Sequence, residues 1–294
     1  MKLFKSQSLL DASSFADIPR GTVKSLVVRF AGTSQAGKTM TLALLGRLRV
    51  NFRTTDIDNL TVSLMSKYNN LKMGVAEFSA AAGGAFAATI VIPFHAPWDD
   101  TNGMYFGEKD GYIELSFPGV TITEIVSGTV SIHTVEAPRI ANYIQTLLQR
   151  NIQIGGAGTA SQELEMSNIS SLYVIEDAVN VSSYLVTADA SEKINGSQAV
   201  LKAYSNMKNR VETAIDLIEL DLNPYDEVSK LLNRQVKVQV IATAAVNLDL
   251  VAESFAFDAN MVTRSGESVA LQLARSTAIA AQRSTANADL ISVV

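Results

Sequence analysis

Apolar and polar positions alternate through the stretch Met40–Arg53, which directly follows a polar, glycine-containing segment. This period of two is typical of a β-strand with one buried and one solvated face. A helix over the same residues would hold Gly46 in its interior, at a cost of about 1 kcal/mol relative to alanine. We therefore expect a long strand with Leu48 facing a core, joined to an earlier strand, Val23–Phe30, by the polar turn Gly32–Lys38.

Short apolar runs bounded by glycine, proline and acidic turns recur along the rest of the chain. The clearest run follows position 235, where valines alternate with polar residues. Strands at this spacing, with no helix between most of them, favour a β-sandwich or barrel over a doubly wound sheet. The expected strands are Phe86–Phe94, Tyr112–Phe117, Val120–Val126, Thr129–Val135, Leu172–Glu176, Val179–Thr187, Ala214–Leu222, Gln235–Thr243 and Ala244–Phe257.

A few short helices are predicted from capping residues or from apolar residues at helical spacing. Asp58 or Asn59 is the expected cap of one helix, and Asp189 with Glu192 has the spacing of a capping box. Asn223, followed by a proline, is a strong helix start. The expected helical segments are one or two turns in Lys2–Phe15, then Asp56–Asn70, Pro138–Gln149, Asp189–Val211 and Pro224–Asn233. Ser268–Leu290 is expected to be a terminal helix or an arm.

The two halves of the chain share an order of elements, in which a strand, a short capped helix and a second strand follow one another. The residues themselves do not repeat, so the pattern indicates a duplicated architecture rather than a duplicated sequence. The matching triplets are Met40–Arg53, Asp58–Asn70 and Phe86–Phe94 in the first half, and Ala214–Leu222, Pro224–Asn233 and Gln235–Thr243 in the second.

Composition narrows the possible functions. With 294 residues, 47% of them hydrophobic and 18% charged, the chain has enough apolar surface for one large domain or two of ordinary size. A net charge of −5 and the lack of a long Lys/Arg run argue against nucleic acid as the main ligand. The absence of cysteine excludes a disulfide framework and thiolate chemistry.

The histidines and the hydropathy pattern add two further expectations. His95 and His133 lie near strand-like segments, which favours structural over catalytic roles. No apolar run reaches the roughly 18 residues needed to span a bilayer, and Met1–Leu10 lacks the continuous apolar region of a secretory signal. We expect a soluble protein that is made in the cytoplasm.

A phosphate-binding loop is the main alternative to a structural role. Gly32, Gly37, Lys38 and Thr39 match the pattern G-x-x-x-x-G-K-[ST], in which backbone N–H groups and the lysine hold phosphates and the threonine holds Mg²⁺. That function requires a helix directly after the loop, with its N-terminus aimed at the anion. Because the following residues alternate with a period of two, we interpret the match as a coincidence and keep a P-loop ATP-binding protein as the alternative.

Oxygen-bearing side chains gather in a second segment. Asp99, Asp100 and Asn102, with Glu108 and Asp110, supply the ligand type that Ca²⁺ prefers. Asp and Asn are also ordinary turn residues, and the spacing does not match an EF-hand loop. Turn chemistry is the favoured interpretation, and these residues are weak calcium candidates.

A third possible function, besides a structural role and ATP binding, is that of a carbohydrate-binding β-sandwich. It would require exposed aromatic residues. Trp98, Tyr105, Phe106 and Tyr112 could supply such a cluster. The same residues would serve equally well as packing anchors between subunits.

With the strands placed, the first half resembles a family of viral coat proteins. The matching stretches are Ile18–Leu26, Gly46–Asn51, Tyr68–Asn70 and Ile92–Pro97, followed by Asp100, Asn102 and Tyr105. They cover about residues 18–135 and resemble the double jelly-roll major capsid proteins of tailless, membrane-containing icosahedral bacteriophages. The second half matches only in its order of elements.

The resemblance implies a mainly β protein with two consecutive eight-stranded jelly rolls and a few short helices. It implies a structural protein and not an enzyme, without cofactors. Three chains would form a pseudo-hexagonal capsomer of the virion, beside other capsid proteins such as pentons and an internal membrane. Synthesis would take place in the host cytoplasm, and no sequence-specific nucleic acid binding is expected.

The expected domain division follows from the resemblance and from the glycine-rich run after Ile154. Residues 1–17 are an N-terminal arm, residues 18–154 the first jelly roll and residues 155–165 a linker. Residues 166–275 are the second jelly roll and residues 276–294 a C-terminal arm. Pro138–Gln149 would be a helix that closes the gap between the rolls.

Overall fold

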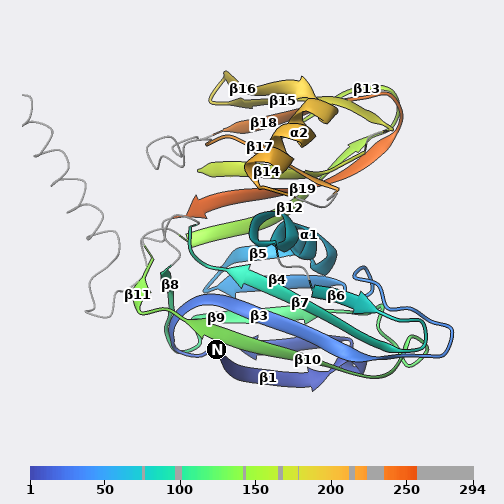
Figure 1. Ribbon diagram of the computed structural model, residues 1–294. Helices are drawn as coiled ribbons and strands as arrows, with labels where there is room; N and C mark the ends of the chain where they lie inside the picture. The colour runs from blue at the N-terminus through green and yellow to red at the C-terminus, as the bar shows by residue number, and fades with distance from the viewer. Residues whose placement is uncertain are drawn as a thin grey trace, which may run out of the picture.

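The chain folds into two stacked β-sandwiches, which lie one above the other in Figure 1. This computed structural model describes residues 1–74, 77–96, 101–141, 144–164, 168–177, 179–211, 216–223 and 235–256. Two clusters of buried apolar side chains mark the two sandwiches. In the described part of the chain, neither helix is long and apolar enough to cross a membrane.

The first sandwich consists of two facing sheets. Its eight principal strands are β1 (Lys2–Ser8), β2 (Ser13–Asp17), β3 (Gly21–Ser34), β4 (Arg47–Phe52), β5 (Thr55–Thr61), β7 (Ala85–Pro93), β9 (Gly111–Ser116) and β10 (Ile125–Glu136). In chain order, the first strand lies beside the eighth, third and sixth (β1-β10-β3-β7), and the second beside the seventh, fourth and fifth (β2-β9-β4-β5). This order is that of a jelly roll. The short strands β6 (Glu77–Ala80), β8 (Asn102–Phe106) and β11 (Arg139–Ile140) extend the first of these sheets.

The second sandwich repeats this order. Its strands are β12 (Ile144–Ile154), β13 (Gly158–Leu164), β14 (Ile169–Ile175), β15 (Val181–Ala188), β16 (Ser191–Ser197), β17 (Leu217–Asp221), β18 (Val236–Ala242) and β19 (Val246–Ala256). Its first strand again lies beside the eighth, third and sixth (β12-β19-β14-β17), and its second beside the seventh, fourth and fifth (β13-β18-β15-β16). The expected fold class, two consecutive eight-stranded jelly rolls, is therefore confirmed.

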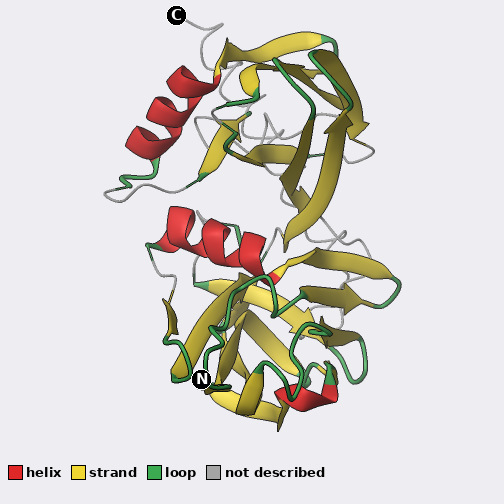
Figure 2. Cartoon of the chain, turned by 90° about the vertical axis from the view of Figure 1, so that its right-hand side faces the viewer, coloured by secondary structure: helices red, strands yellow, loops and turns green. Residues whose placement is uncertain are grey.

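Each roll carries one helix at the same place, between its fifth and sixth principal strands. These are α1 (Val62–Met73) and α2 (Gln198–Lys208). Both lie on the same side of the molecule, as Figure 2 shows: α1 is wedged between the rolls and α2 lies on the outer side of the second roll. The expected duplication of architecture is correct, but the pairing of its elements was wrong, because α2 is the counterpart of α1 and Pro224–Asn233 lies outside the described residues.

A single sheet runs through both rolls. The strand β5 of the first roll pairs in parallel with β12 of the second, through Leu147 opposite Asp58 and Leu148 opposite Asn59. The resulting eight-stranded sheet has the order β17-β14-β19-β12-β5-β4-β9-β2. The two rolls therefore share backbone hydrogen bonds as well as side-chain contacts.

The strand expected over Met40–Arg53 is half as long as predicted. Leu48 faces the core and Arg49 does not, as expected, but β4 begins only at Arg47. Before it, the chain makes successive turns that end at Gly46, which has a left-handed φ of 68°. A Cβ atom there would lie 2.0 Å from the carbonyl oxygen of Ser116, so glycine is required where the chain enters the sheet.

The helix expected over Asp56–Asn70 is a strand followed by a helix. Its first half is β5, which pairs with β4 on one side and β12 on the other. The helical cap is Thr61, whose side-chain oxygen accepts a hydrogen bond from the backbone N–H of Leu64 at 3.3 Å. Asp58 and Asn59 resemble caps in sequence, but pairing with strands on both sides keeps them extended.

The expected helix Pro138–Gln149 is wrong. From Ile144 onward the chain forms β12, which lies in the middle of the continuous sheet between β5 and β19. A strand that is buried on both faces loses its period of two, and an apolar run of this kind cannot be distinguished from a buried helix by periodicity. The described residues of this segment contain no helix that closes the gap between the rolls, and β12 instead pairs with β5 of the first roll.

The expected helix over Asp189–Val211 is a hairpin followed by a shorter helix. Asp189 and Ala190 both have positive φ values, 50° and 62°, and form the two-residue turn between β15 and β16. The helix α2 begins only after Ser197. The apparent capping box of Asp189 and Glu192 therefore belongs to a hairpin turn.

The terminal and linking segments also differ in secondary structure from expectation. Residues 1–17, expected to be an arm with helical turns, supply β1, a short 3₁₀ helix η1 (Leu9–Asp11) and β2, and so contribute a strand to each sheet of the first roll. In the expected linker, residues 155–165, the stretch Gly158–Leu164 forms β13. The expected strands Val120–Val126 and Thr129–Val135 are a turn and one strand, β10. Residues 257–294, which include the expected C-terminal arm, lie outside the described part.

Candidate functional site

The junction between the rolls is organised around α1. This helix begins at the Thr61 cap and ends at Gly74, whose left-handed φ of 65° closes the last turn on the carbonyl of Asn70. Toward the first roll, the Asn69 side chain pairs with the backbone of Val91 in β7, donating at 2.8 Å and accepting at 2.7 Å. The opposite face of α1 packs against the outer face of the second roll's sheet, so the helix contacts both rolls.

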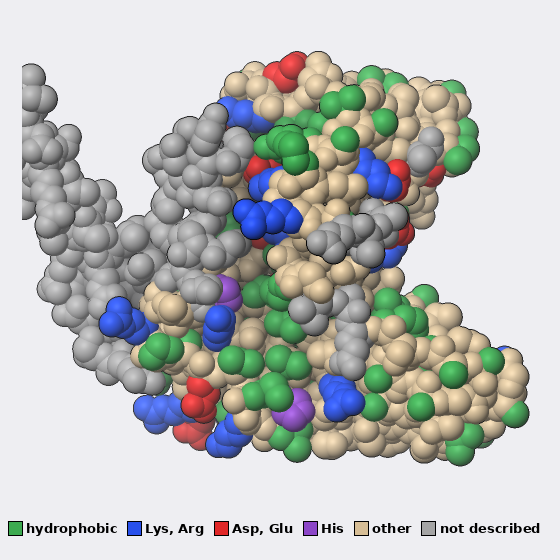
Figure 3. Space-filling view, in the orientation of Figure 1, with side chains coloured by type: hydrophobic (Ala, Val, Ile, Leu, Met, Phe, Trp, Pro, Cys, Tyr) green, Lys and Arg blue, Asp and Glu red, His purple; other side chains and the backbone are tan. Residues whose placement is uncertain are grey.

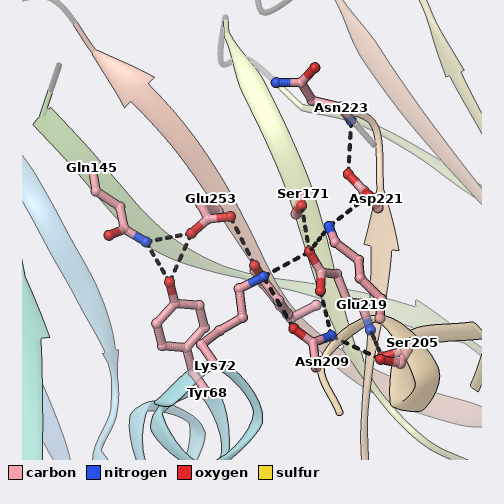
Figure 4. A network of polar contacts seen from close by, with 12 residues as sticks. Tyr68, Lys72, Gln145, Ser171, Ser205, Asn209, Glu219, Asp221, Asn223 and Glu253 are labelled. Atoms are coloured by element: carbon pink, nitrogen blue, oxygen red, sulfur yellow. Dashed lines mark hydrogen bonds and ion pairs between the residues drawn. The ribbon is translucent and has the colours of Figure 1, made fainter. Parts of the chain in front are cut away.

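A buried hydrogen-bond network joins α1 to the second roll (Figure 4). The Tyr68 hydroxyl donates to Glu253 Oε1 at 2.8 Å, and the Tyr173 hydroxyl donates to Glu253 Oε2 at 2.8 Å. The Gln145 amide donates to both Tyr68 and Glu253. The rings of Tyr68 and Tyr173 meet edge to face at 5.1 Å. Burial raises the pKa of Glu253, although the ammonium group of Lys72 opposes this shift.

A charged cluster continues the network toward α2. Glu219 on β17 accepts from Lys72 of α1 at 3.0 Å and from Lys208 of α2 at 2.9 Å, and Lys208 also reaches Asp221 at 2.6 Å. Burial alone would raise the pKa of Glu219, but the two ammonium groups and the Asn209 amide outweigh it and lower this pKa to about 2. Glu219 is therefore ionised and links the helices of both rolls to one strand.

A buried carboxyl group lies where the two halves of the sheet meet. Asp58 Oδ1 accepts a hydrogen bond from the backbone N–H of Leu147 at 3.0 Å, and its other oxygen has no hydrogen-bond partner among the described residues. Burial raises the pKa of Asp58 well above its ordinary value of about 3.9. Two positions earlier on β5, Asp56 is half-buried beside Arg49, and hydrogen bonds from Arg49, Asn51 and Asn59 outweigh burial and lower the pKa of Asp56.

We expect Asp58→Asn to stabilise the chain at neutral pH, because it keeps the acceptor for Leu147 and removes a costly buried charge. A raised folded-state pKa gives stability that is present below about pH 3.9 and lost as the pH rises, so the gain over wild type should shrink toward acid pH. Asp56→Asn is the matched control and should show the opposite sign: a loss at neutral pH that fades as the pH falls below about 4. Thermal melting of both variants between pH 2 and 8 measures this. The assignment is refuted if both variants shift the midpoint in the same direction.

The residues that match the phosphate-binding loop pattern do not form such a loop. Gly32 lies inside β3 rather than in a turn, where a Cβ atom would come within 2.2 Å of the Ser127 carbonyl oxygen and 2.7 Å of Phe86 Cζ. Its lack of a side chain is therefore required by strand packing. Gly37 has a left-handed φ of 75° in the following turn.

The lysine of the motif makes contacts within the protein instead of facing an open anion site. Lys38 makes an ion pair with Glu124 at 3.2 Å, and its carbonyl accepts from the N–H of Gly83. The residues after Thr39 form turns between Thr41 and Gly46 and then β4, so no helix N-terminus is aimed at the loop. The P-loop alternative has no support.

The calcium candidates are only partly within the described residues. Asp99 and Asp100 lie outside them, and Asn102 begins β8. Asp110 accepts from the Gly107 N–H at 3.0 Å and lies 3.8 Å from Arg53, as a turn residue would. In the described part of the chain no cluster of acidic residues and histidines has the arrangement of a metal site, and calcium at Asp99, Asp100 and Asn102 stays a prediction.

Of the aromatic residues considered for carbohydrate binding, Trp98 lies outside the described residues, and Phe106 and Tyr112 pack against other rings. Phe106 is fully buried and contacts Phe52 and Phe94. Tyr112 lies against Phe15, at a centroid distance of 4.9 Å. The Tyr105 hydroxyl accepts from Arg20.

A pocket of about 380 Å³ opens beside the junction and is lined by both rolls. Among the described residues that line it, only Arg47 and Asp249 carry a charge. His95 and His133 are not among its lining residues. The pocket thus lacks the pair of titratable groups that general acid–base chemistry would use.

Reasoning from sequence missed Tyr68, Lys72, Glu219 and Glu253. One signal could have indicated them: both helices contain a tyrosine followed four positions later by a lysine, Tyr68 with Lys72 and Tyr204 with Lys208. A second signal is an acidic residue at a buried position of an otherwise apolar strand, as in β17.

Two jelly rolls of one topology, joined edge to edge within one chain, define the double jelly-roll class of proteins. The crystal structure of the STIV MCP has this fold at a TM-score of 0.67 and 9% identity, over 88% of this chain and 96% of that chain. A structure of Sulfolobus Turreted Icosahedral Virus gives 0.67 at 10% identity, over 88% and 90%. The major capsid protein P2 from Bacteriophage PM2 gives 0.60 at 13% identity, over 91% and 97%. No protein-family model and no curated protein matches the chain.

Proposed function

We propose that this chain is a major capsid protein that self-assembles as trimeric, pseudo-hexagonal capsomers into an icosahedral virus shell. The observation that carries the proposal is the repeated strand order of the two rolls. Three copies would present six lobes of one topology around an axis, and such a ring tiles a hexagonal lattice. The similar structures named above, an icosahedral virus and a major capsid protein, support the same function.

The rigid junction supports this proposal as well. A shared sheet, a helix with both faces buried and the ion pairs of Glu219 hold the rolls in one arrangement. A capsomer lobe needs fixed geometry, since small changes of angle between lobes accumulate over a closed shell. The proposed role is structural rather than enzymatic, and the proposed location is the virion after synthesis in the host cytoplasm. Its proposed partners are further copies of itself, pentons and the internal viral membrane.

The oligomeric mass of the purified chain tests the proposal. We expect sedimentation equilibrium to give three times the 31.5 kDa chain mass, and negative-stain images to show a six-lobed outline. A chain that remains monomeric at high micromolar concentration would contradict the proposal.

A further inference from the structure

The second helix presents an apolar stripe to solvent. Val200, Tyr204 and Met207 lie at positions i, i+4 and i+7, so they share one face of α2. Their exposed fractions are 64%, 42% and 71%. The opposite face, with Gln198 and Ser205, is buried against the second roll. An outward apolar stripe on a helix is the reverse of the usual surface pattern and indicates a contact surface.

The counterpart of this stripe on α1 is buried. When the helices are matched at their capping residues, Thr61 and Ser197, the stripe corresponds to Leu64, Tyr68 and Leu71, and all three are buried. The match extends to the lysines Lys72 and Lys208, which both bind Glu219.

The inward contacts of the two helices confirm the match. Asn69 binds the backbone of Val91 in β7, and Ser205, at the matching position, accepts from the backbone N–H of Glu219 in β17 at 2.9 Å. Both strands are the sixth of their roll. Each helix is therefore fixed to its own roll in the same way, and Val91 corresponds to Glu219.

The stripe on α1 is covered by one particular face of the second roll. This face is the outer side of β17-β14-β19-β12, where Tyr173 and Glu253 contact Tyr68. The residue of the first roll that corresponds to Tyr173 follows from strand pairing. Tyr173 pairs with Glu219 in the second roll, and Val27 pairs with Val91 in the first. Because Val91 corresponds to Glu219, Val27 corresponds to Tyr173.

The matching face of the first roll is partly exposed and is apolar around Val27, while the next row along the sheet, Arg29 with Ser131 and Thr89, is polar. It is the outer side of β7-β3-β10-β1, where His133 pairs with Val27 and Val135 follows two positions later. These side chains and Val91 are incompletely buried within the single chain. Figure 3 shows hydrophobic side chains around a histidine on this part of the lower roll.

We infer that the α2 stripe docks on this face of a second copy of the chain, with Tyr204 against Val27. This contact between two chains would be equivalent to the contact that α1 makes with the second roll within one chain. His133 offers a polar partner for the Tyr204 hydroxyl. The contact is heterologous, with the helix on the second roll of one copy and the sheet on the first roll of the next, and it closes into a ring when the rotation per chain is one third of a turn. The inference rests on the proposed capsomer and names the surface that builds it.

Cross-linking between engineered cysteines tests the contact, because the natural chain has none. We expect a mixture of the Tyr204→Cys and Val27→Cys variants to form covalent dimers with a short bismaleimide, and each variant alone to form none. The double variant should give covalent dimers and trimers. Trimers of the wild-type chain combined with no cross-linking in the mixture would overturn the inference but leave the proposed function standing.

Acidic substitutions on the stripe give a second test. Met207→Glu and Val200→Glu change exposed side chains and should leave the melting of the isolated chain unchanged, yet weaken trimer formation at least tenfold in sedimentation equilibrium. Ile241→Glu on β18 is the control, since it also replaces an exposed apolar residue of the second roll, and it should leave the trimer intact. Unaltered association of the stripe variants would refute the contact, whereas a monomeric wild-type chain would refute the capsomer itself.

Discussion

Glu219→Ala is expected to lower the free energy of unfolding by about 3–5 kcal/mol, because it removes a buried carboxylate and leaves two partly buried ammonium groups without their shared partner. The Glu219 side chain is only 1% exposed, and those of Lys72 and Lys208 are 18% and 27% exposed. Asp221 remains beside Lys208 in the variant, but Lys72 keeps no carboxylate within an ion-pair distance that the structure records. Chemical denaturation of wild type and variant at pH 7 measures the difference.

Asp216→Ala is the matched control. Asp216 also bridges the rolls, with Lys67 at 2.5 Å, but its side chain is 54% exposed. Exposed ion pairs contribute little, so this variant should lose less than about 1 kcal/mol. Equal losses at the two sites would show that burial does not decide the strength of the junction.

The pH dependence of the Glu219 contribution has a definite sign. The folded-state pKa of about 2 lies below the unfolded value of about 4.3. The stability from this carboxylate is therefore present above about pH 4.3 and lost as the pH falls toward 2. The stability difference between wild type and Glu219→Ala should narrow over that range.

The fold class could be predicted from sequence because half-buried strands keep their period of two. The alternating valines of β18 and the core-facing Leu48 of β4 are examples, and both are confirmed. Strands that lie between two layers lose this signal, which is why β12 was mistaken for a helix. The resemblance to double jelly-roll proteins, carried by short stretches of the first half, is confirmed as a similarity of fold.

The junction could not be predicted because its partners are far apart in sequence. Tyr68 and Glu253 are separated by 185 residues, and Lys72 and Glu219 by 147. The local sequence shows only that Glu219 lies in an otherwise apolar strand; its burial and its pairing with two lysines depend on its position beside the two helices. The phosphate-loop match fails for the same reason: Gly32 and Lys38 are explained by Phe86 and Glu124, which the motif does not contain.

Deleting residues 1–12 is expected to abolish cooperative folding of the first roll. An arm that reaches away from the body would be dispensable, but this segment contains β1, which pairs with β10 at six residue pairs from Lys2 opposite Thr134 to Ser8 opposite Thr129. Its loss would leave β10 as an unpaired edge and would remove Leu9 from the core. Near-UV circular dichroism and thermal melting of the truncated chain measure the effect. Melting indistinguishable from that of the full chain would show that the segment is an arm after all.

Two neighbouring leucines separate the loss of packing from the loss of chain length. Leu9 is fully buried and its side chain lies against Gly128 of β10, whereas Leu10 is 39% exposed. Leu9→Ala should therefore cost about 2–5 kcal/mol, as large-to-small changes in a core do, and Leu10→Ala less than about 1 kcal/mol. Both substitutions remove the same atoms from the same 3₁₀ helix, so a difference between them can only come from burial. If the denaturant midpoints of the two variants coincide, the first strand is not anchored through this turn. The deletion of residues 1–12 would then no longer be expected to abolish cooperative folding.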